Sequence, residues 1–204
     1  MNTRTDSDQV SETTAALAPA YRLLGGLYLE PPTEQTVQAI SAWGSAIDNE
    51  GESLPAELQN AFETVQTGPT ADIDRFKGAF TELVQGVGYG PSPAPPYESL
   101  YVDGVLNGPS SSEIEAFYLE MGVELAVDDE LIDHAGYELA FLAELCDRNA
   151  LDAQLGFIRT HIGAWIDEFH DEALSYDPPT FYQGVFELTE SLLEFHRETL
   201  EEER

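Results

Sequence analysis

Apolar side chains recur at three- and four-residue spacing along most of the chain, which is the period of an amphipathic α-helix. Alternation of the kind that predicts strands is not found over a useful length. The pattern predicts helices beginning at or near Ser11, Thr33, Pro55, Thr70, Ser112, Asp133, Asp152 and Thr180. The sequence therefore predicts an all-α fold, a single bundle of roughly eight helices.

Residues 86–111 interrupt this pattern, because glycine and proline crowd their first half. We expect a long irregular Gly/Pro-rich loop over 87–110, joining helical halves at about 11–86 and 111–200 in one domain spanning 11–200. Residues 1–10 are predicted to be a flexible N-terminus. The loop also carries aromatic side chains at Tyr89, Tyr97 and Tyr101, which is typical of a functional loop or one packed on the body.

Charge narrows the classes of partner. The chain has 8 Lys+Arg against 39 Asp+Glu, a formal net charge of −31, and the acids occur along its whole length. Binding to nucleic acid or to an anionic membrane surface needs cations that this chain lacks. Hydrophobic residues still make up 42%, enough for a packed core. The many acidic side chains repel one another, and concentrated salt screens this repulsion. We therefore expect a halophilic source. The alternative is an ordinary acidic bacterial protein.

The single cysteine, Cys146, cannot form an internal disulfide. The N-terminal residues lack the basic and apolar blocks of an export signal, and no apolar run approaches the length that spans a bilayer. We therefore expect a cytoplasmic protein without membrane insertion.

Motifs for catalysis and metal binding are sparse. His134 and Glu138 lie four residues apart, but two ligands are too few for zinc. His161 falls close to an apolar stripe and is expected in the core or at its boundary, whereas His170 and His196 are expected to be exposed. No phosphate-binding loop and no Gly-x-Ser-x-Gly elbow is present. The sequence therefore predicts no catalytic residue and no metal site.

Two segments are unusual for plain packing. The 95–103 segment reads Pro-Pro-Tyr-Glu-Ser-Leu-Tyr-Val-Asp, and the 131–139 segment reads Leu-Ile-Asp-His-Ala-Gly-Tyr-Glu-Leu. In structural terms, Tyr97 and Tyr101 would anchor the loop on the core, and Asp133 would cap a helix in which His134 pairs with Glu138.

Together the two segments resemble those of the TorD/DmsD/NarJ superfamily of redox-enzyme maturation chaperones. The resemblance extends from about residue 17 to 195 and includes the helix of 21–28 and the aromatic positions between Phe157 and Tyr182. This sequence departs from the family pattern at Ile132, where proline is common, and at Ala135. The resemblance implies an all-helical cytoplasmic protein that binds a molybdoenzyme precursor, often through its twin-arginine signal peptide.

The resemblance also implies a partner-binding surface, made of Pro96, Tyr97, Glu98, Ser99, Tyr101, Asp133, His134 and Glu138. The chemistry fits such a client, because carboxylates bind guanidinium groups while tyrosine and proline form an apolar groove. We expect the client's arginines to bind Glu98, Asp133 and Glu138.

The expected function is that of a non-enzymatic chaperone that holds the precursor of a DMSO-, TMAO- or nitrate-reductase-type molybdoenzyme during cofactor insertion, before export. Three alternatives stay open: a nitrate-reductase-type chaperone for a non-exported client segment, a weak nucleotide-binding enzyme, and a helical interaction module without molybdoenzyme clients. No cofactor is expected, although the resemblance leaves room for weak binding of guanine nucleotide or of the molybdenum cofactor. The long loop permits a monomer or a domain-swapped dimer.

Overall fold

Eleven α-helices and one π-helical turn form the part of the chain that this computed structural model describes, residues 6–50, 56–67, 73–85, 92–123 and 131–202. The elements are Asp6–Ala16 (α1), Ala18–Leu29 (α2), Glu34–Glu50 (α3), Ala56–Thr67 (α4), Ile73–Phe80 (α5), Thr81–Gln85 (η1), Glu98–Val102 (α6), Pro109–Glu120 (α7), Ala135–Asp147 (α8), Leu151–Thr160 (α9), Ile162–Leu174 (α10) and Thr180–Glu202 (α11). Within those ranges, the extended backbone pairing is an isolated bridge between Tyr97 and His134. The predicted all-α fold is confirmed.

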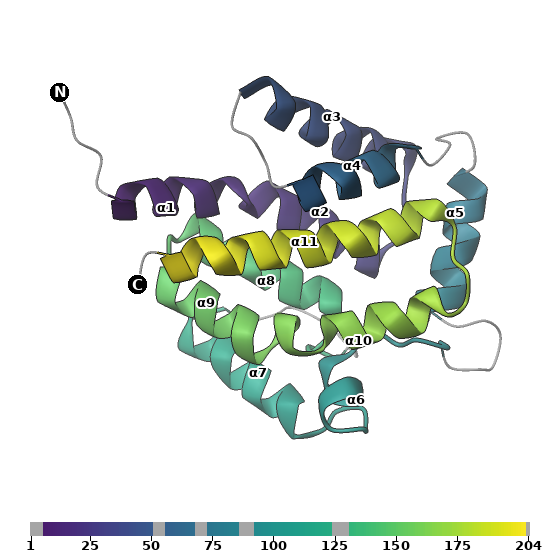
Figure 1. The fold of residues 1–204 in the computed structure, drawn as a ribbon. Helices are drawn as coiled ribbons and strands as arrows, with labels where there is room; N and C mark the ends of the chain where they lie inside the picture. Colours follow the sequence, from purple (N-terminus) through teal and green to yellow (C-terminus); the bar gives the residue numbers. More distant parts are fainter. Residues whose placement is uncertain (1–5, 51–55, 68–72, 86–91, 124–130, 203–204) are drawn as a thin grey trace.

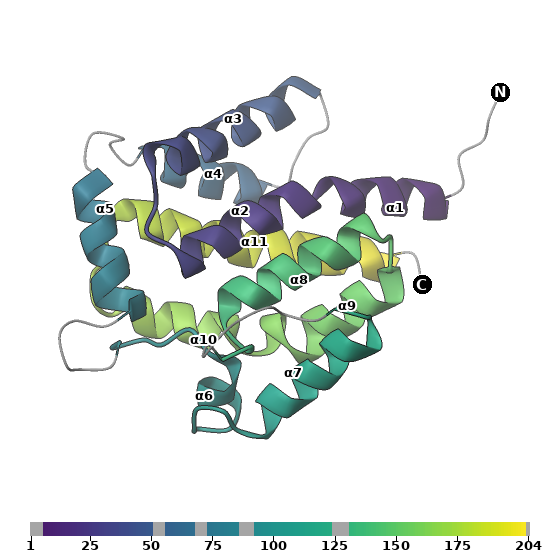
Figure 2. The same cartoon turned by 180° about the vertical axis from the view of Figure 1, so that it is seen from behind.

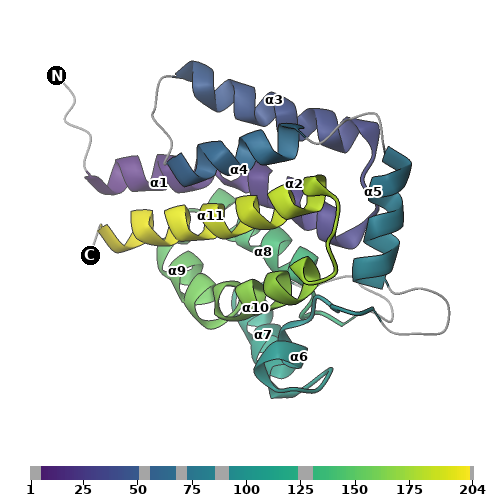
Figure 3. The same ribbon diagram turned by 45° about the vertical axis from the view of Figure 1, so that its right-hand side comes forward.

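Helix α11, 23 residues long, runs through the middle of the bundle (Figure 1). It packs on α4 along one side, and α9 and α10 lie along the other (Figure 3). Seen from behind, α2 lies along α8, and these two helices form another extensive contact of the fold (Figure 2). Helices α6 and α7 lie together at one end of the molecule, beside α10.

The helix boundaries follow from local chemistry. Pro19 occupies the first turn of α2, where its missing N–H costs nothing, and the chain breaks from α1 at Leu17. Thr33 caps α3 as predicted, because its Oγ1 accepts a hydrogen bond from the backbone N–H of Thr36 at 3.1 Å. Gly122, with a φ of +70°, ends α7 as predicted.

Two glycines set the distance between α2 and α8. A Cβ atom added at Gly25 would lie 2.7 Å from the carbonyl oxygen of Gly136, and one added at Gly136 would lie 2.7 Å from that of Gly25. The backbones therefore touch where α8 begins, directly after His134. This contact fixes the 131–139 segment against α2.

Three predicted boundaries are wrong. The 87–110 loop is not irregular throughout, because α6 forms within it. Helix α7 begins at Pro109 rather than Ser112. Residues 86–91 lie outside the described part. The Asp103 carboxylate explains the early start of α7, since its Oδ2 accepts the N–H of Ser110 at 2.9 Å. At the other end of the chain, the first helix begins at Asp6 rather than near Ser11, and the flexibility of residues 1–10 stays a prediction.

The helix predicted from Asp152 is two helices, α9 and α10, separated at His161. His161 has a φ of −122° and a ψ of −109°, which no helix residue adopts. Its ring turns inward and is buried, as expected for a histidine of the core.

None of the described helices has the length and hydropathy that crossing a membrane requires.

Candidate functional site

The fold joins the 95–103 and 131–139 segments by backbone hydrogen bonds. The N–H of Ala135 donates to the carbonyl of Pro96, and the N–H of Glu98 donates to the carbonyl of Asp133, both at 2.9 Å. Between these bonds Tyr97 and His134 face each other, with ring centroids 5.0 Å apart in an edge-on arrangement. The two segments singled out in the sequence therefore form one structural unit.

Asp133 holds this unit together in a way that the sequence did not indicate. Its fully buried carboxylate accepts the backbone N–H of Ser99 at 2.9 Å, and Tyr97, the residue before α6, offers no side-chain cap of its own. Asp133 thus caps α6 from a segment 34 residues away. The prediction that Asp133 caps its own helix, α8, is wrong, because His134 caps that helix.

His134 caps α8 through Nδ1, which accepts the N–H of Gly136 at 3.1 Å. Burial lowers the pKa of His134 to about 4, so the ring is neutral at pH 7 and Nδ1 is free to accept. This bond places the proton of the neutral ring on Nε2. The predicted pair of His134 with Glu138 does not form: His134 bonds to Gly136, and Glu138 bonds to Trp165.

Glu98 and Glu138 lie beneath the unit. Both oxygens of Glu98 lie 3.1 Å from Nδ1 of His161, and the indole N–H of Trp165 donates to Oε2 of Glu138 at 3.3 Å. Oε1 of Glu138 is buried and accepts no hydrogen bond from the described residues. Burial, and then the charge of Glu98, raises the pKa of Glu138 well above the usual carboxyl range, because two adjacent buried carboxylates cannot both ionise cheaply. Burial also raises the pKa of Glu98, although its bond to His161 opposes the shift.

The exposure of these acids matters for their role. The exposed fractions of Glu98, Asp133 and Glu138 are 2%, 0% and 0%. Carboxylates so placed serve the internal contacts of the joined segments. A client's guanidinium group would reach them only after those contacts opened.

A cavity of about 390 Å³ opens beside the joined segments. Its walls come from α2, α5, η1, the approach to α6, the turn before α7 and the start of α8. We call it the uncharged cavity, and it is lined by Tyr28, Leu29, Phe80, Val84, Ser92, Pro95, Tyr97, Leu106, Leu131, His134 and Tyr137. No aspartate, glutamate, lysine or arginine is among these described lining residues, although the chain has 39 acids.

One residue of the cavity lining lies in a stretch that carries exposed apolar side chains. Leu106 lines it with 46% of its surface exposed, and Val102 and Val105 are 53% and 56% exposed on the same short stretch. Isolated exposed apolar residues are ordinary, but three within five residues, one of them in the lining of an uncharged cavity, are typical of an interaction surface. Leu106 and Tyr137 were not among the predicted site residues, although Tyr137 belongs to the 131–139 segment.

The predicted site residues thus divide into two groups. Tyr97 and His134 line the cavity, whereas Pro96 and Ser99 are buried in the joint, where Ser99 Oγ accepts the N–H of Asn107 at 3.0 Å. Tyr101 turns away from the cavity: its ring stacks on Trp165. Its hydroxyl donates to Glu172 at 3.0 Å.

The predicted exposure of His170 and His196 is wrong, since both rings are fully buried. His170 lies between Tyr28 and Glu190, and His196 lies 3.0 Å from the Tyr21 hydroxyl and 2.9 Å from Gln154. Burial lowers the pKa of both, that of His196 to about 3.

Among the described residues, no group of three or more histidine, cysteine or acidic side chains is arranged to hold a metal ion.

Known proteins resemble this chain in sequence and in fold. The family model described as nitrate reductase delta subunit matches residues 45–171. Chaperone protein TorD of Shewanella loihica is 29% identical over 188 residues, covering 86% of this chain and 88% of that protein. Chaperone protein TorD of Shewanella pealeana is 28% identical over 120 residues, so the chain spans about half the length of that relative, 54%.

Among solved structures, one described as a redox enzyme maturation protein from Archaeoglobus fulgidus has the same fold. The TM-score is 0.54 at 20% identity, and the match covers 91% of this chain and 94% of that one. The relatives are named as chaperones and maturation proteins rather than enzymes, in agreement with the prediction from the sequence.

Proposed function

The chain belongs to the TorD superfamily of redox-enzyme maturation chaperones, and we propose that it binds the precursor of a molybdopterin oxidoreductase through the uncharged cavity. The client segment that we propose is the twin-arginine signal peptide, which offers an arginine pair followed by an apolar stretch. Binding in the cytoplasm would shield this segment until the molybdenum cofactor is inserted and the enzyme is released for export.

The observation that carries this proposal is the absence of charge among the described lining residues of the cavity. An apolar peptide segment desolvates no charged lining residue when it enters such a site, and each buried leucine-sized side chain contributes roughly 1.5–3 kcal/mol. Tyr97 and Tyr137 add rigid aromatic surface with a hydroxyl at its edge, which suits peptide recognition. The cavity therefore favours the apolar part of the client over its arginines.

The buried carboxylates take a positioning role in this account. Asp133 caps α6, and Glu98 and Glu138 hold the joint from below, so that Tyr97 and His134 face the client in a fixed geometry. We propose that contact with the client is made by Tyr97, His134 and Tyr137.

The test uses a fluorescent peptide with the signal sequence of the oxidoreductase encoded beside this chain. Tyr137→Ala should weaken binding by about tenfold, since it removes an aromatic contact of 1–2 kcal/mol. Tyr176→Ala is the matched control, because Tyr176 is 53% exposed and lies outside the cavity lining. Equal affinity of the two variants would contradict the assignment of the cavity.

The type of client is a separate question. The name of the family model favours a nitrate-reductase-type client, which need not be exported, whereas the TorD relatives favour a client with an export signal. Co-purification of the tagged chain with its client, followed by mass spectrometry, distinguishes the two. Recovery of an oxidoreductase without a twin-arginine sequence would favour the first.

A further inference from the structure

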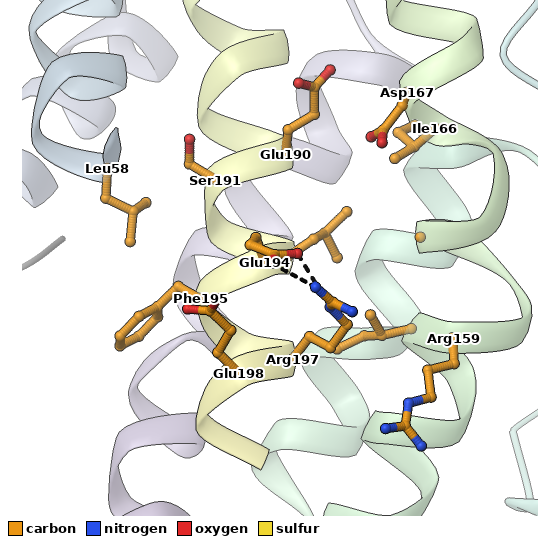
Figure 4. Close-up of a pocket in the computed structure, with 13 residues that line it drawn as sticks. Leu58, Arg159, Ile166, Asp167, Glu190, Ser191, Glu194, Phe195, Arg197 and Glu198 are labelled. Atoms are coloured by element: carbon orange, nitrogen blue, oxygen red, sulfur yellow. Dashed lines mark hydrogen bonds and ion pairs between the residues drawn. The ribbon is translucent and has the colours of Figure 1, made fainter. Parts of the chain in front are cut away.

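A second and larger cavity lies on another face of the bundle. It has a volume of about 740 Å³ and is bounded by α9 and α10 on one side and by α11 on the other, with Leu58 of α4 next to α11 (Figure 4). We call it the α10–α11 cavity. It shares no lining residue with the uncharged cavity.

Two acids lie at the same end of this cavity. Asp167 projects from α10 and Glu190 from α11, while Arg159 lies at the opposite end (Figure 4). Partial burial, and then the charge of Glu190, raises the pKa of Asp167 above its usual value. A cation placed between the two carboxylates would remove this repulsion.

Glu190 differs from the many solvated acids of the chain because it is held in place. Nδ1 of the fully buried His170 lies 2.5 Å from Oε1 of Glu190, and Nε2 of the same ring lies 2.8 Å from the hydroxyl of Tyr28. Burial lowers the pKa of His170, so the ring is neutral, with Nδ1–H donating to Glu190 and Nε2 accepting from Tyr28. A carboxylate fixed in this way loses little side-chain entropy when it binds a partner.

The basic residues of the cavity are already engaged. Arg197 pairs with Glu194 at 2.5 Å, and Arg159 pairs with Glu201 at 2.7 Å. In the described part of the chain, no lysine or arginine pairs with Asp167 or Glu190. The acidic end of the cavity thus has no internal cation.

The floor next to this acidic end is apolar. Ile158, Ile166 and Leu193 form it, and each has 4% or less of its surface exposed. A segment that places a cation at the acidic end would bury its neighbouring side chains on this floor.

We propose that the α10–α11 cavity is a docking groove for a segment of a partner protein in which an arginine or lysine is flanked by apolar side chains. Its cation lies between Asp167 and Glu190, and the apolar side chains cover Ile158, Ile166 and Leu193. Charge complementarity over an apolar floor selects this occupant over an uncharged apolar segment and over an acidic one. The groove is distinct from the site of the proposed function and provides a second contact surface.

The probe is a short blocked peptide with one arginine flanked by leucines, and a matched peptide has glutamine in place of the arginine. Amide chemical shifts of the labelled full chain should change at Gly163, Asp167 and Ser191 on binding. Asp167→Asn should weaken the arginine peptide by about three- to tenfold, because one of two partly exposed charge partners is lost. The glutamine peptide should bind both proteins equally and more weakly.

Glu187→Gln is the control, since Glu187 is exposed on α11 and lies outside the cavity lining. Thermal unfolding of each variant confirms that it is folded. The proposal is overturned if Asp167→Asn and Glu187→Gln weaken binding alike, if the shifts fall elsewhere, or if free arginine amide binds as tightly as the peptide. Shifts at Leu131 and Tyr137 report the uncharged cavity instead, so failure of this proposal does not imply failure of the proposed function.

Discussion

The uncharged cavity and the α10–α11 cavity are built in opposite ways. The uncharged cavity is closed by segments far apart in the chain, joined at the bridge between Tyr97 and His134, and none of its described lining residues is acidic or basic. The α10–α11 cavity lies mainly between helices of the last third of the chain and has four acids and two arginines in its lining. In a chain with 39 acids, a surface without charge is the more informative feature. Acids become informative only where they are fixed, as His170 fixes Glu190.

The largest expected effect comes from the contact that positions the uncharged cavity. Gly25→Ala places a Cβ atom 2.7 Å from the Gly136 carbonyl and should lower the free energy of unfolding by about 2–3 kcal/mol. It should also weaken client binding, because α8 begins at this contact. Gly26→Ala is the adjacent control: nothing lies within 4 Å of its Cβ, so it should stabilise the protein by about 0.5–1 kcal/mol. Equal effects in urea unfolding would contradict the account.

The next effect concerns the cap between the two segments. Asp133→Ala removes the acceptor for the Ser99 amide and should cost about 1–2 kcal/mol, with faster hydrogen exchange at that amide. Asp133→Asn keeps an oxygen acceptor and should preserve most of the protection. If the alanine variant binds client normally, the joint is not needed for recognition.

The buried acids beneath the joint give a pH dependence. A carboxyl group whose pKa is raised by folding binds its proton more tightly in the folded state, so stability falls as pH rises above the unfolded value of about 4.3 toward the raised one. Glu138→Gln removes this loss and keeps the acceptor for Trp165. The difference in unfolding free energy between variant and wild type should therefore grow as pH rises. A constant difference from pH 4 upward would show that Glu138 is ionised in the fold.

Salt should change peptide affinity differently at the two cavities, and this is the smallest of the expected effects. Molar KCl shortens the Debye length to ~3 Å and should weaken the arginine peptide at the α10–α11 cavity several-fold. Binding of the apolar client segment should be unchanged or tighter. Titrations of both peptides in dilute and molar KCl check this contrast, and loss of both interactions in salt would contradict it.

The net charge of −31 also predicts that the protein melts at higher temperature in molar KCl, as expected for a halophilic source.

The sequence could predict the long helices, because their apolar stripes are continuous and their ends carry caps such as Thr33 and Gly122. It could also single out the two segments that the fold joins. It could not predict α6, because the cap comes from Asp133 in a distant segment. The break at His161 is similarly hidden, since the apolar stripe continues across it while the ring turns toward Glu98.

The predicted roles of polar residues were the least accurate for a related reason. His170 and His196 look like surface residues, but their partners Tyr28, Glu190, Tyr21 and Gln154 come from other helices. Glu98 and Glu138 likewise lie in the core because each finds a buried partner. Satisfying a buried polar group is a property of the tertiary fold, which a helical pattern does not report.

The central claim is that the client's apolar segment occupies the uncharged cavity. The most direct measurement is the set of amide and aromatic chemical-shift changes when the client's signal peptide is added to the labelled full chain. The account predicts changes at Leu106, Leu131, His134 and Tyr137, and their loss when the apolar residues of the peptide are replaced by serine. Changes confined to other surfaces, with these four residues unaffected, would contradict it.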